Sequence, residues 1–247
     1  MKRKTLIITN PGEKGEKGYC EGVNKDIELY RSFLQSPQGG LWQESEIRTL
    51  ERPNVSAVEA EVSRLHLADY SFVVYSGHAY HSGRSTILEL KRGVELDSAK
   101  LRVGSSKHTL ILDCCRVVEK PTLLEKAMMK ALQARPILHP DACRLYYDKH
   151  LEKCPTGLVV LYGCSINETA GDDASMGGYY SASLIESAEE WVASNSGLDT
   201  QRKFAIRSVV EAHAGAASKV ATLSGNRQTP DIQKPRTEPY YPFSIVT

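Results

Sequence analysis

The chain lacks the sequence features of a membrane or secreted protein. No run of about 18 apolar residues occurs, so no segment is expected to span a bilayer. The N-terminus offers only a short apolar stretch, residues 5–9, before Asn10-Pro11-Gly12, so the apolar core of a signal peptide is missing. We therefore expect a soluble, cytoplasmic protein.

The sequence also lacks an excess of charge of either sign. Its 31 Lys and Arg residues nearly cancel its 30 Asp and Glu residues, which leaves a formal net charge of +1. Without a basic excess, the charge balance favours neither nucleic acid nor an anionic membrane as a partner. We therefore predict no nucleic-acid partner and no membrane partner.

Cysteine is scarce, and its spacing is not that of a disulfide-rich or metal-binding domain. The six cysteines form no Cys-x-x-Cys motif and are too few for a disulfide scaffold in 247 residues. We expect free thiols in a reducing compartment. His78 and His81 do not lie one turn apart on any predicted helix, and no cysteine pair has the spacing of zinc ligands, so we predict no metal site.

What the sequence does contain is an alternation of strand-like and helical patterns. Such an alternation predicts an α/β protein with a mainly parallel sheet covered on both faces, and we expect residues 1–247 to form one domain. The predicted strands are 5–9, 46–50, 70–78, 107–115, 156–164 and 242–246, with a hairpin at 86–96. The predicted helices are 22–34, 56–67, 178–194 and 202–223, with helical structure also expected over 119–154.

Two local features refine these boundaries. Residues 56–59, Ser-Ala-Val-Glu, have the form of a capping box that would open the helix at 56–67. Residues 225–241 contain several prolines and polar residues, and we predict a loop there.

Two of the predicted strands end in residues that carry chemistry. Residues 70–78 end in His78, and residues 107–115 end in Cys115. Because the carboxyl ends of parallel strands share one edge of a sheet, these two side chains are a candidate base and nucleophile. Side chains alternate along a strand, so one of Cys114 and Cys115 is expected in the core and the other at the edge. A single cysteine or histidine at the end of a strand, such as Cys115 or His78 taken alone, is more often a core residue than a catalytic one.

The residues around these two positions carry a more specific signal. Residues 75–78, Tyr-Ser-Gly-His, and residues 110–115, Leu-Ile-Leu-Asp-Cys-Cys, resemble the paired histidine and cysteine motifs of the caspase and metacaspase superfamily. Further segments resemble the family in its own order: Gly22-Val23 with Asp26, residues 162–164, residues 177–180 and residues 228–230.

The resemblance implies a three-layer α/β/α caspase-like fold with a six-stranded, mostly parallel sheet. It also implies a cysteine endopeptidase, similar to the prokaryotic metacaspases or orthocaspases, that acts through a thioester acyl-enzyme. By analogy with the family, a role in antiviral defence or cell death is expected. Self-cleavage would fall in the segment after the nucleophile, at Lys120, Lys126, Lys130 or Arg135.

The resemblance also assigns roles to individual residues. The family's nucleophile follows an aspartate by two positions, which selects Cys115, and the histidine of its motif falls on His78. His78 would act as general base or as proton donor to the leaving amine. The oxyanion hole would consist of the backbone amides of Cys115 and Ala79, where the family usually has glycine at the second position. A positive φ at this position would strain alanine.

Charge near the motifs predicts the substrate preference. Asp113 lies beside the proposed nucleophile, and Asp172 matches an acid of metacaspase-like sequences. Two carboxylates in a narrow pocket repel each other, and a basic side chain relieves that repulsion, so we predict cleavage after Arg or Lys. Ser76 would help to line this pocket. The alternatives are a backbone-bonded hydroxyl for Ser76 and a polar turn for Asp172.

Other charged residues leave further alternatives open. Glu168 is a reserve acid for the pocket, while Arg84 and Arg116 lie near the motifs and are candidates for reading an acidic substrate instead.

The sequence leaves open whether the protein needs calcium and whether it is catalytic at all. Calcium activation stays open. Calcium prefers six to eight oxygen ligands, and this segment offers only the scattered carboxylates Glu89, Glu95 and Asp97 without an adjacent acid pair, so we predict no cofactor. The expected partner is a protein or peptide substrate, with a regulatory partner left open. The alternative function is a non-catalytic caspase-like interaction module.

Overall fold

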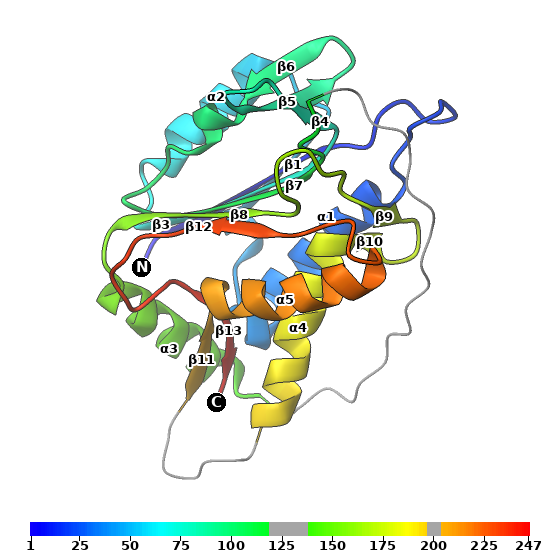
Figure 1. The fold of residues 1–247 in the computed structure, drawn as a ribbon. Coiled ribbons are helices and arrows are strands. Elements are labelled where there is room, and N and C mark those ends of the chain that lie inside the picture. Colours follow the sequence, from blue (N-terminus) through cyan, green and yellow to red (C-terminus); the bar gives the residue numbers. More distant parts are fainter. Residues whose placement is uncertain (119–137, 197–203) are drawn as a thin grey trace.

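A six-stranded sheet lies at the centre of the molecule (Figure 1). The computed structural model describes residues 1–118, 138–196 and 204–247. The strand order is β12-β8-β7-β3-β1-β2, and every neighbouring pair is parallel except β12 with β8. The six strands are β1 (Arg3–Asn10), β2 (Ile47–Glu51), β3 (Tyr70–Gly77), β7 (Lys107–Cys114), β8 (Gly157–Tyr162) and β12 (Asp231–Gln233). The predicted six-stranded, mostly parallel sheet is confirmed.

The central strands are apolar because both of their faces are covered. All eight residues of β3 are buried, which is typical of a parallel strand between two layers. Alternate side chains enter two separate cores: Phe72 and Val74 belong to one, and Val73 and Tyr75 belong to the other. The sheet is therefore the middle layer of three.

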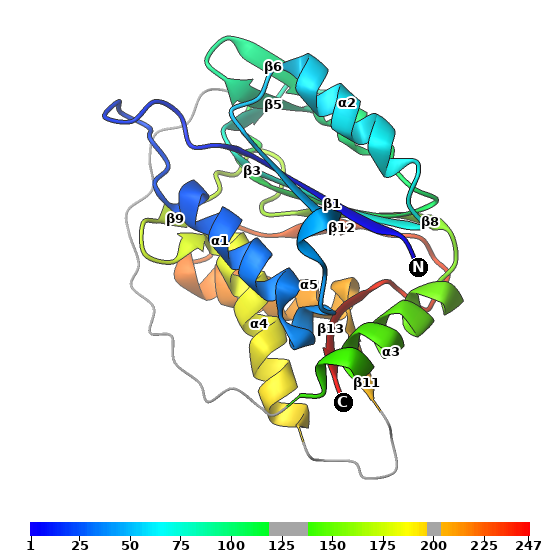
Figure 2. The same ribbon diagram turned by 180° about the vertical axis from the view of Figure 1, so that it is seen from behind.

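The two outer layers differ in composition, as Figures 1 and 2 show from opposite sides. One face carries α1 (Gly22–Gln35), α3 (Pro140–Lys153), α4 (Tyr179–Asn195) and α5 (Val209–Leu223). The other face carries α2 (Val55–Leu65), the short helix η3 (Ser98–Leu101) and the small sheet of β4 (Ala79–His81), β5 (Thr86–Lys91) and β6 (Val94–Asp97). This arrangement confirms the three-layer fold class.

The remaining elements are short. Two further 3₁₀ helices, η1 (Pro37–Gly39) and η2 (Glu44–Glu46), connect α1 to β2. The hairpin of β9 (Asp172–Asp173) and β10 (Gly177–Gly178) precedes α4, and β11 (Ala205–Ser208) pairs with β13 (Pro242–Val246) in a separate two-stranded sheet. No helix among the described residues is long and apolar enough to cross a membrane.

The strand predicted at 242–246 is confirmed as β13, but the prediction of a loop over 225–241 was wrong. The sixth strand of the central sheet is β12, inside the segment 225–241 that was predicted as a loop, whereas β13 pairs outside that sheet. Only four residues lie between Pro230 and Pro235, too few to give a strand pattern, and β12 gains its partner only through antiparallel pairing with β8.

Two helix starts were also predicted wrongly. The helix predicted from residue 202 begins at Val209, after β11, where Ser208 and Glu211 form a capping box. The capping box predicted at 56–59 does not open α2, because α2 already begins at Val55 with Asn54 as its N-cap residue. Of the helical structure expected over 119–154, α3 covers 140–153, while residues 119–137 lie outside the described residues.

The register of β3 and β7 places the candidate site. Ser76 pairs with Asp113 and Gly77 with Cys114, so the next residues of both strands leave the sheet at the same level. Gly77 has a φ of 145°, and a Cβ added there would lie 2.3 Å from the Asn10 carbonyl oxygen of β1. Glycine is therefore required where the chain turns out of the sheet toward His78.

Candidate functional site

His78 is held from the side by the loop that follows β1. Its Nε2 lies 3.3 Å from the carbonyl oxygen of Pro11 and 3.8 Å from the sulfur of Cys20. A carbonyl oxygen can only accept a hydrogen bond, so this contact favours a proton on Nε2, and Nδ1 has no hydrogen-bond partner among the described residues. Glycine at position 12 leaves room for the ring, because a Cβ there would lie only 2.8 Å from Nε2 of His78.

Cys115 lies just beyond the end of β7. Cys114 is 1% exposed and belongs to the core, whereas Cys115 is partly exposed, so the predicted alternation is confirmed. The Cys115 sulfur lies 3.8 Å from the carbonyl oxygen of Ala170. Burial raises the pKa of the Cys115 thiol, and the charges of Asp113 and Asp172 add to this, so the thiol needs a base to become nucleophilic.

No hydrogen bond joins His78 to Cys115 among the described residues. The two residues nevertheless follow adjacent, in-register strands at the same edge of the sheet. Hydrogen bonds of catalytic pairs are often long in the absence of substrate, so this arrangement is compatible with a dyad. All six cysteines are free, as predicted.

Ala79 is the first residue of β4 and is buried. It is not among the described residues that have positive φ, so alanine causes no backbone strain here. Ala79 pairs with Leu88, and the Glu89 N–H donates to the His78 carbonyl oxygen. In this antiparallel pattern, the N–H of Ala79 points away from β5 and is not used by the ladder.

Two buried carboxylates lie beneath the edge of the sheet. Asp113 accepts hydrogen bonds from the N–H and the hydroxyl of Ser181, at 2.9 and 2.7 Å. Asp26 accepts from the Ser76 hydroxyl at 2.5 Å and from the Gly178 N–H at 2.8 Å. A Cβ on Gly178 would lie 2.5 Å from Asp113 and 3.1 Å from Asp26, so both carboxylates converge on this glycine.

These carboxylates lie in an environment that disfavours their charge. Burial raises the pKa of Asp113 to about 6, and the charge of Asp172 adds to it. Burial also raises the pKa of Asp26 well above its usual value, with a further contribution from the charge of Asp113. Asp172 is partly buried in β9, and its carboxylate accepts from the Gly22 N–H at 2.9 Å. Three acids therefore share one electrostatic environment.

Asp26 is the functional candidate that sequence reasoning missed. It was matched to the family's first helix without a role in the pocket. Within α1 it lies three residues after Val23 and four before Tyr30, on the buried face of the helix. A charged residue on an apolar helix face is rare unless it has a partner or a function, and this was the available signal.

Ser76 contacts the acidic cluster, whereas the carboxylate of Glu168 is bonded to loop backbone. Ser76 is buried and donates to the carboxylate of Asp26, so its hydroxyl is not simply bonded to backbone. Glu168 accepts from the N–H groups of Ser165 and Thr229, and so ties two loops together.

The two arginines near the motifs do not belong to the acidic cluster. Arg116 is buried, stacks 3.9 Å over the ring of Tyr162 and donates to the Cys164 carbonyl oxygen. Arg84 is exposed in the turn between β4 and β5.

Two of the three candidate calcium ligands, Glu95 and Asp97, are engaged with other groups. Glu95 accepts from the Tyr80 hydroxyl, and Asp97 accepts from Ser85 and from the Ala99 N–H. Over the described ranges, no group of three or more His, Cys, Asp or Glu side chains is arranged to hold a metal ion.

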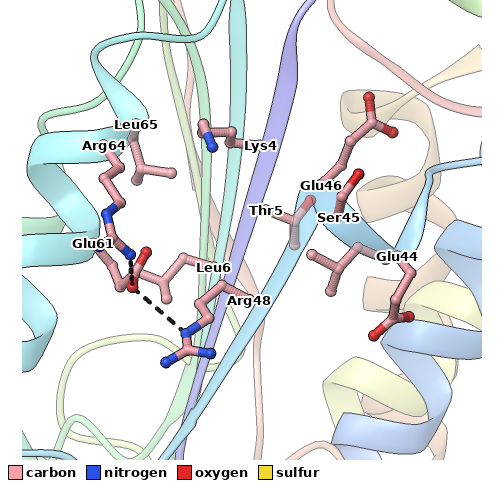
Figure 3. Close-up of a pocket in the computed structure, with 11 residues that line it drawn as sticks. Lys4, Thr5, Leu6, Glu44, Ser45, Glu46, Arg48, Glu61, Arg64 and Leu65 are labelled. Atoms are coloured by element: carbon pink, nitrogen blue, oxygen red, sulfur yellow. Dashed lines mark hydrogen bonds and ion pairs between the residues drawn. The ribbon is translucent and has the colours of Figure 1, made fainter.

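A separate hollow of about 260 Å³ lies toward the amino ends of β1 and β2, beside α2 (Figure 3). Glu61 bridges Arg48 and Arg64 across it, at 3.5 and 2.6 Å. The carboxylates that line it all form ion pairs with arginines, so the acidic cluster at the opposite end of the strands is the stronger candidate for binding a cation.

Comparisons with known proteins place the chain in a family. The family model described as "Caspase domain" matches residues 2–241. Among solved structures, the chain is similar to caspase-1 from Spodoptera frugiperda, with a TM-score of 0.55 and 10% sequence identity over 94% of this chain and 86% of that one. That likeness supports the fold, and a comparison with curated proteins found no match. Because the family model spans nearly all of the sequence, the chain belongs to the caspase-domain family and is a peptidase of the cysteine type.

Proposed function

We propose that this protein is an endopeptidase that cleaves after Arg or Lys by means of a dyad of Cys115 and His78. The observation that carries the proposal is the register of β3 and β7, which brings both residues to one edge of the sheet directly beside buried acids. Cytoplasmic location, similarity to metacaspases and a role in defence or cell death stay predictions from the sequence.

The chemistry follows from the groups available. Nδ1 of His78 takes the proton of the Cys115 thiol as the sulfur attacks the scissile carbonyl carbon. The carbonyl oxygen becomes an oxyanion, stabilised by the amides of Ala79 and Cys115. The imidazolium then protonates the leaving amine as the C–N bond breaks, which leaves a thioester. Water, deprotonated by His78, hydrolyses the thioester and restores the thiol.

The substrate preference follows from the acids. Asp26 and Asp113 receive hydrogen bonds only from hydroxyl and amide groups in the described part of the chain, with no arginine or lysine bound to either. A guanidinium or ammonium group would supply the missing positive charge and lower the cost of ionising both carboxylates. An aspartate side chain would add to the repulsion instead.

A matched set of peptides tests the proposal. Fluorogenic peptides that differ only in Arg, Lys or Asp before the scissile bond are incubated with the protein, with and without calcium. We expect turnover after Arg and Lys, and a loss of at least about a thousandfold in Cys115→Ala with the fold retained. Cys114→Ala is the neighbouring control and should keep most activity. No turnover of any peptide would favour a non-catalytic interaction module, and turnover after Asp would overturn the pocket assignment.

A further inference from the structure

A second cysteine contacts the candidate base, although the proposed reaction does not use it. Cys20 lies in the loop between β1 and α1, and its sulfur is 3.8 Å from Nε2 of His78. Its backbone N–H also donates to the Pro11 carbonyl oxygen at 2.8 Å, and that oxygen is the other neighbour of Nε2. One residue thus touches both the imidazole and the carbonyl that faces it.

The hydrogen-bonding roles of Cys20 can be assigned from its neighbours. Its sulfur lies 3.5 Å from the Gly18 carbonyl oxygen, which accepts the thiol proton. With that proton engaged, a sulfur lone pair is left to face Nε2. Nε2 therefore has two acceptors, the Cys20 sulfur and the Pro11 oxygen, and both favour a proton on this nitrogen.

The state of the thiol fits this role better than that of a nucleophile. Burial raises the pKa of Cys20 far above its usual value, and the charges of Asp172, Cys115, Asp113 and Asp26 contribute in the same direction. Cys20 is therefore a neutral thiol, which is a poor nucleophile.

We propose that Cys20 is a positioning residue for His78: with the Pro11 carbonyl it holds the Nε2 proton and directs Nδ1 toward the nucleophile. This inference rests on the proposed function, because it assigns Nδ1 as the base. The contact stabilises the imidazolium formed during attack, since both acceptors face its Nε2–H. Cys20 thereby fixes both the tautomer and the orientation of the His78 ring within the dyad.

The first test needs no catalysis. Protein with ¹⁵N-labelled histidine in a Cys115→Ala background is titrated by NMR. We expect the Nε2-protonated tautomer of His78 in this background, and a mixture of tautomers after Cys20→Ala. Cys20→Ser restores a side-chain acceptor and should recover most of the Nε2 form. Cys143→Ala, a buried thiol that bonds to Thr247, is the control and should change nothing.

The second test measures turnover of the arginyl peptide. We expect Cys20→Ala to lower kcat about three- to tenfold with KM unchanged and to shift the acidic limb of the pH profile, with partial rescue by Cys20→Ser. Unchanged His78 tautomers in Cys20→Ala would overturn the inference even in an active enzyme. Changed tautomers without any turnover would support the positioning role and count against the proposed function, so the two failures are distinguishable.

Discussion

The two ends of the central sheet differ in whether their buried charges have partners of opposite sign among the described residues. At the amino end, Arg3 is buried and forms ion pairs with Glu46 at 3.5 Å and Asp148 at 3.4 Å, while Arg144 pairs with Glu46 at 2.8 Å. At the carboxyl end, Asp26 and Asp113 are buried and, among the described residues, bonded only by neutral donors.

The difference favours a structural role for the charges at the amino end and the proposed substrate-binding role for those at the carboxyl end. Opposite charges tie β1 to α3, and removing Arg3 would take a buried cation from both Glu46 and Asp148, while Glu46 would keep Arg144. Asp26 and Asp113 are buried like charges that no cation among the described residues pairs, which opposes folding, and such groups are often retained at functional sites. The acids at the carboxyl end are therefore the candidates for binding a basic substrate side chain, as proposed above.

The largest expected effect comes from neutralising the carboxyl end. Asp113→Asn should lower kcat/KM for arginyl peptides by about a thousandfold, because the guanidinium loses a buried counter-charge. A citrulline peptide of nearly the same shape but without charge should be much less affected. The free energy of unfolding in urea should stay the same or rise. Equal losses for both peptides would contradict a charge-reading pocket.

The converse change removes the cation from the amino end. Arg3→Met should lower the free energy of unfolding by about 3 kcal/mol, because Glu46 and Asp148 lose a buried partner. The ratio of kcat/KM for arginyl and lysyl peptides should not change in the folded fraction. Urea denaturation measures the first quantity. A changed substrate preference would show that the two clusters are not independent.

The pH dependence of cation binding provides a third test of the acids at the carboxyl end. Because burial raises the pKa of Asp113 to about 6, ionisation of this carboxyl limits the binding of a cation below that pH. The affinity for agmatine, a small guanidinium compound, should rise by up to about tenfold between about pH 5 and about pH 7. Calorimetry measures this affinity, and Asp113→Asn should flatten the profile.

Stability should respond to pH in the opposite direction. The folded chain holds the Asp113 proton more tightly than the unfolded chain, whose carboxyl has its usual pKa near 3.8. The resulting stabilisation is complete below that value and is lost as the pH rises through about 6. Denaturation of the wild type and Asp113→Asn at several pH values isolates this contribution. A contribution that grew with pH would contradict it.

The smallest expected effect comes from substitutions in the loop that faces His78. Gly12 and Gly15 have nearly the same φ, 91° and 90°, but only Gly12 approaches the ring, since an added Cβ at Gly15 meets nothing within 4 Å. Gly12→Ala and Gly15→Ala therefore share the backbone strain and differ in the clash with Nε2. Gly12→Ala should lower kcat/KM about tenfold further than Gly15→Ala. Equal values would show that the loop does not position the base.

The sequence could predict those parts of the molecule that depend on local pattern. The apolar runs before His78 and Cys115 gave the central strands, and alternation separated the buried Cys114 from the partly exposed Cys115. Motif resemblance then gave the family. These features need no knowledge of contacts between distant segments.

What the sequence could not give depends on long-range contacts. The strand β12 is three residues long and exists through its pairing with β8, some 70 residues earlier in the chain. Asp26 is recognised as a pocket candidate only from its hydrogen bond to Gly178, which joins α1 to β10. Cys20 is recognised only from the contact of the β1–α1 loop with His78. No spacing rule within one segment predicts such meetings.

Affinity labelling tests whether Cys115 is the nucleophile and lies beside a pocket for basic side chains. An arginyl peptide with an acyloxymethyl ketone, which alkylates an activated thiol, is incubated with the protein, and the modified residue is identified by peptide mass mapping. We expect one label on Cys115, formed much faster than with the aspartyl analogue and absent in Cys115→Ala. A label on Cys20 or Cys114, or equal rates with both peptides, would contradict it.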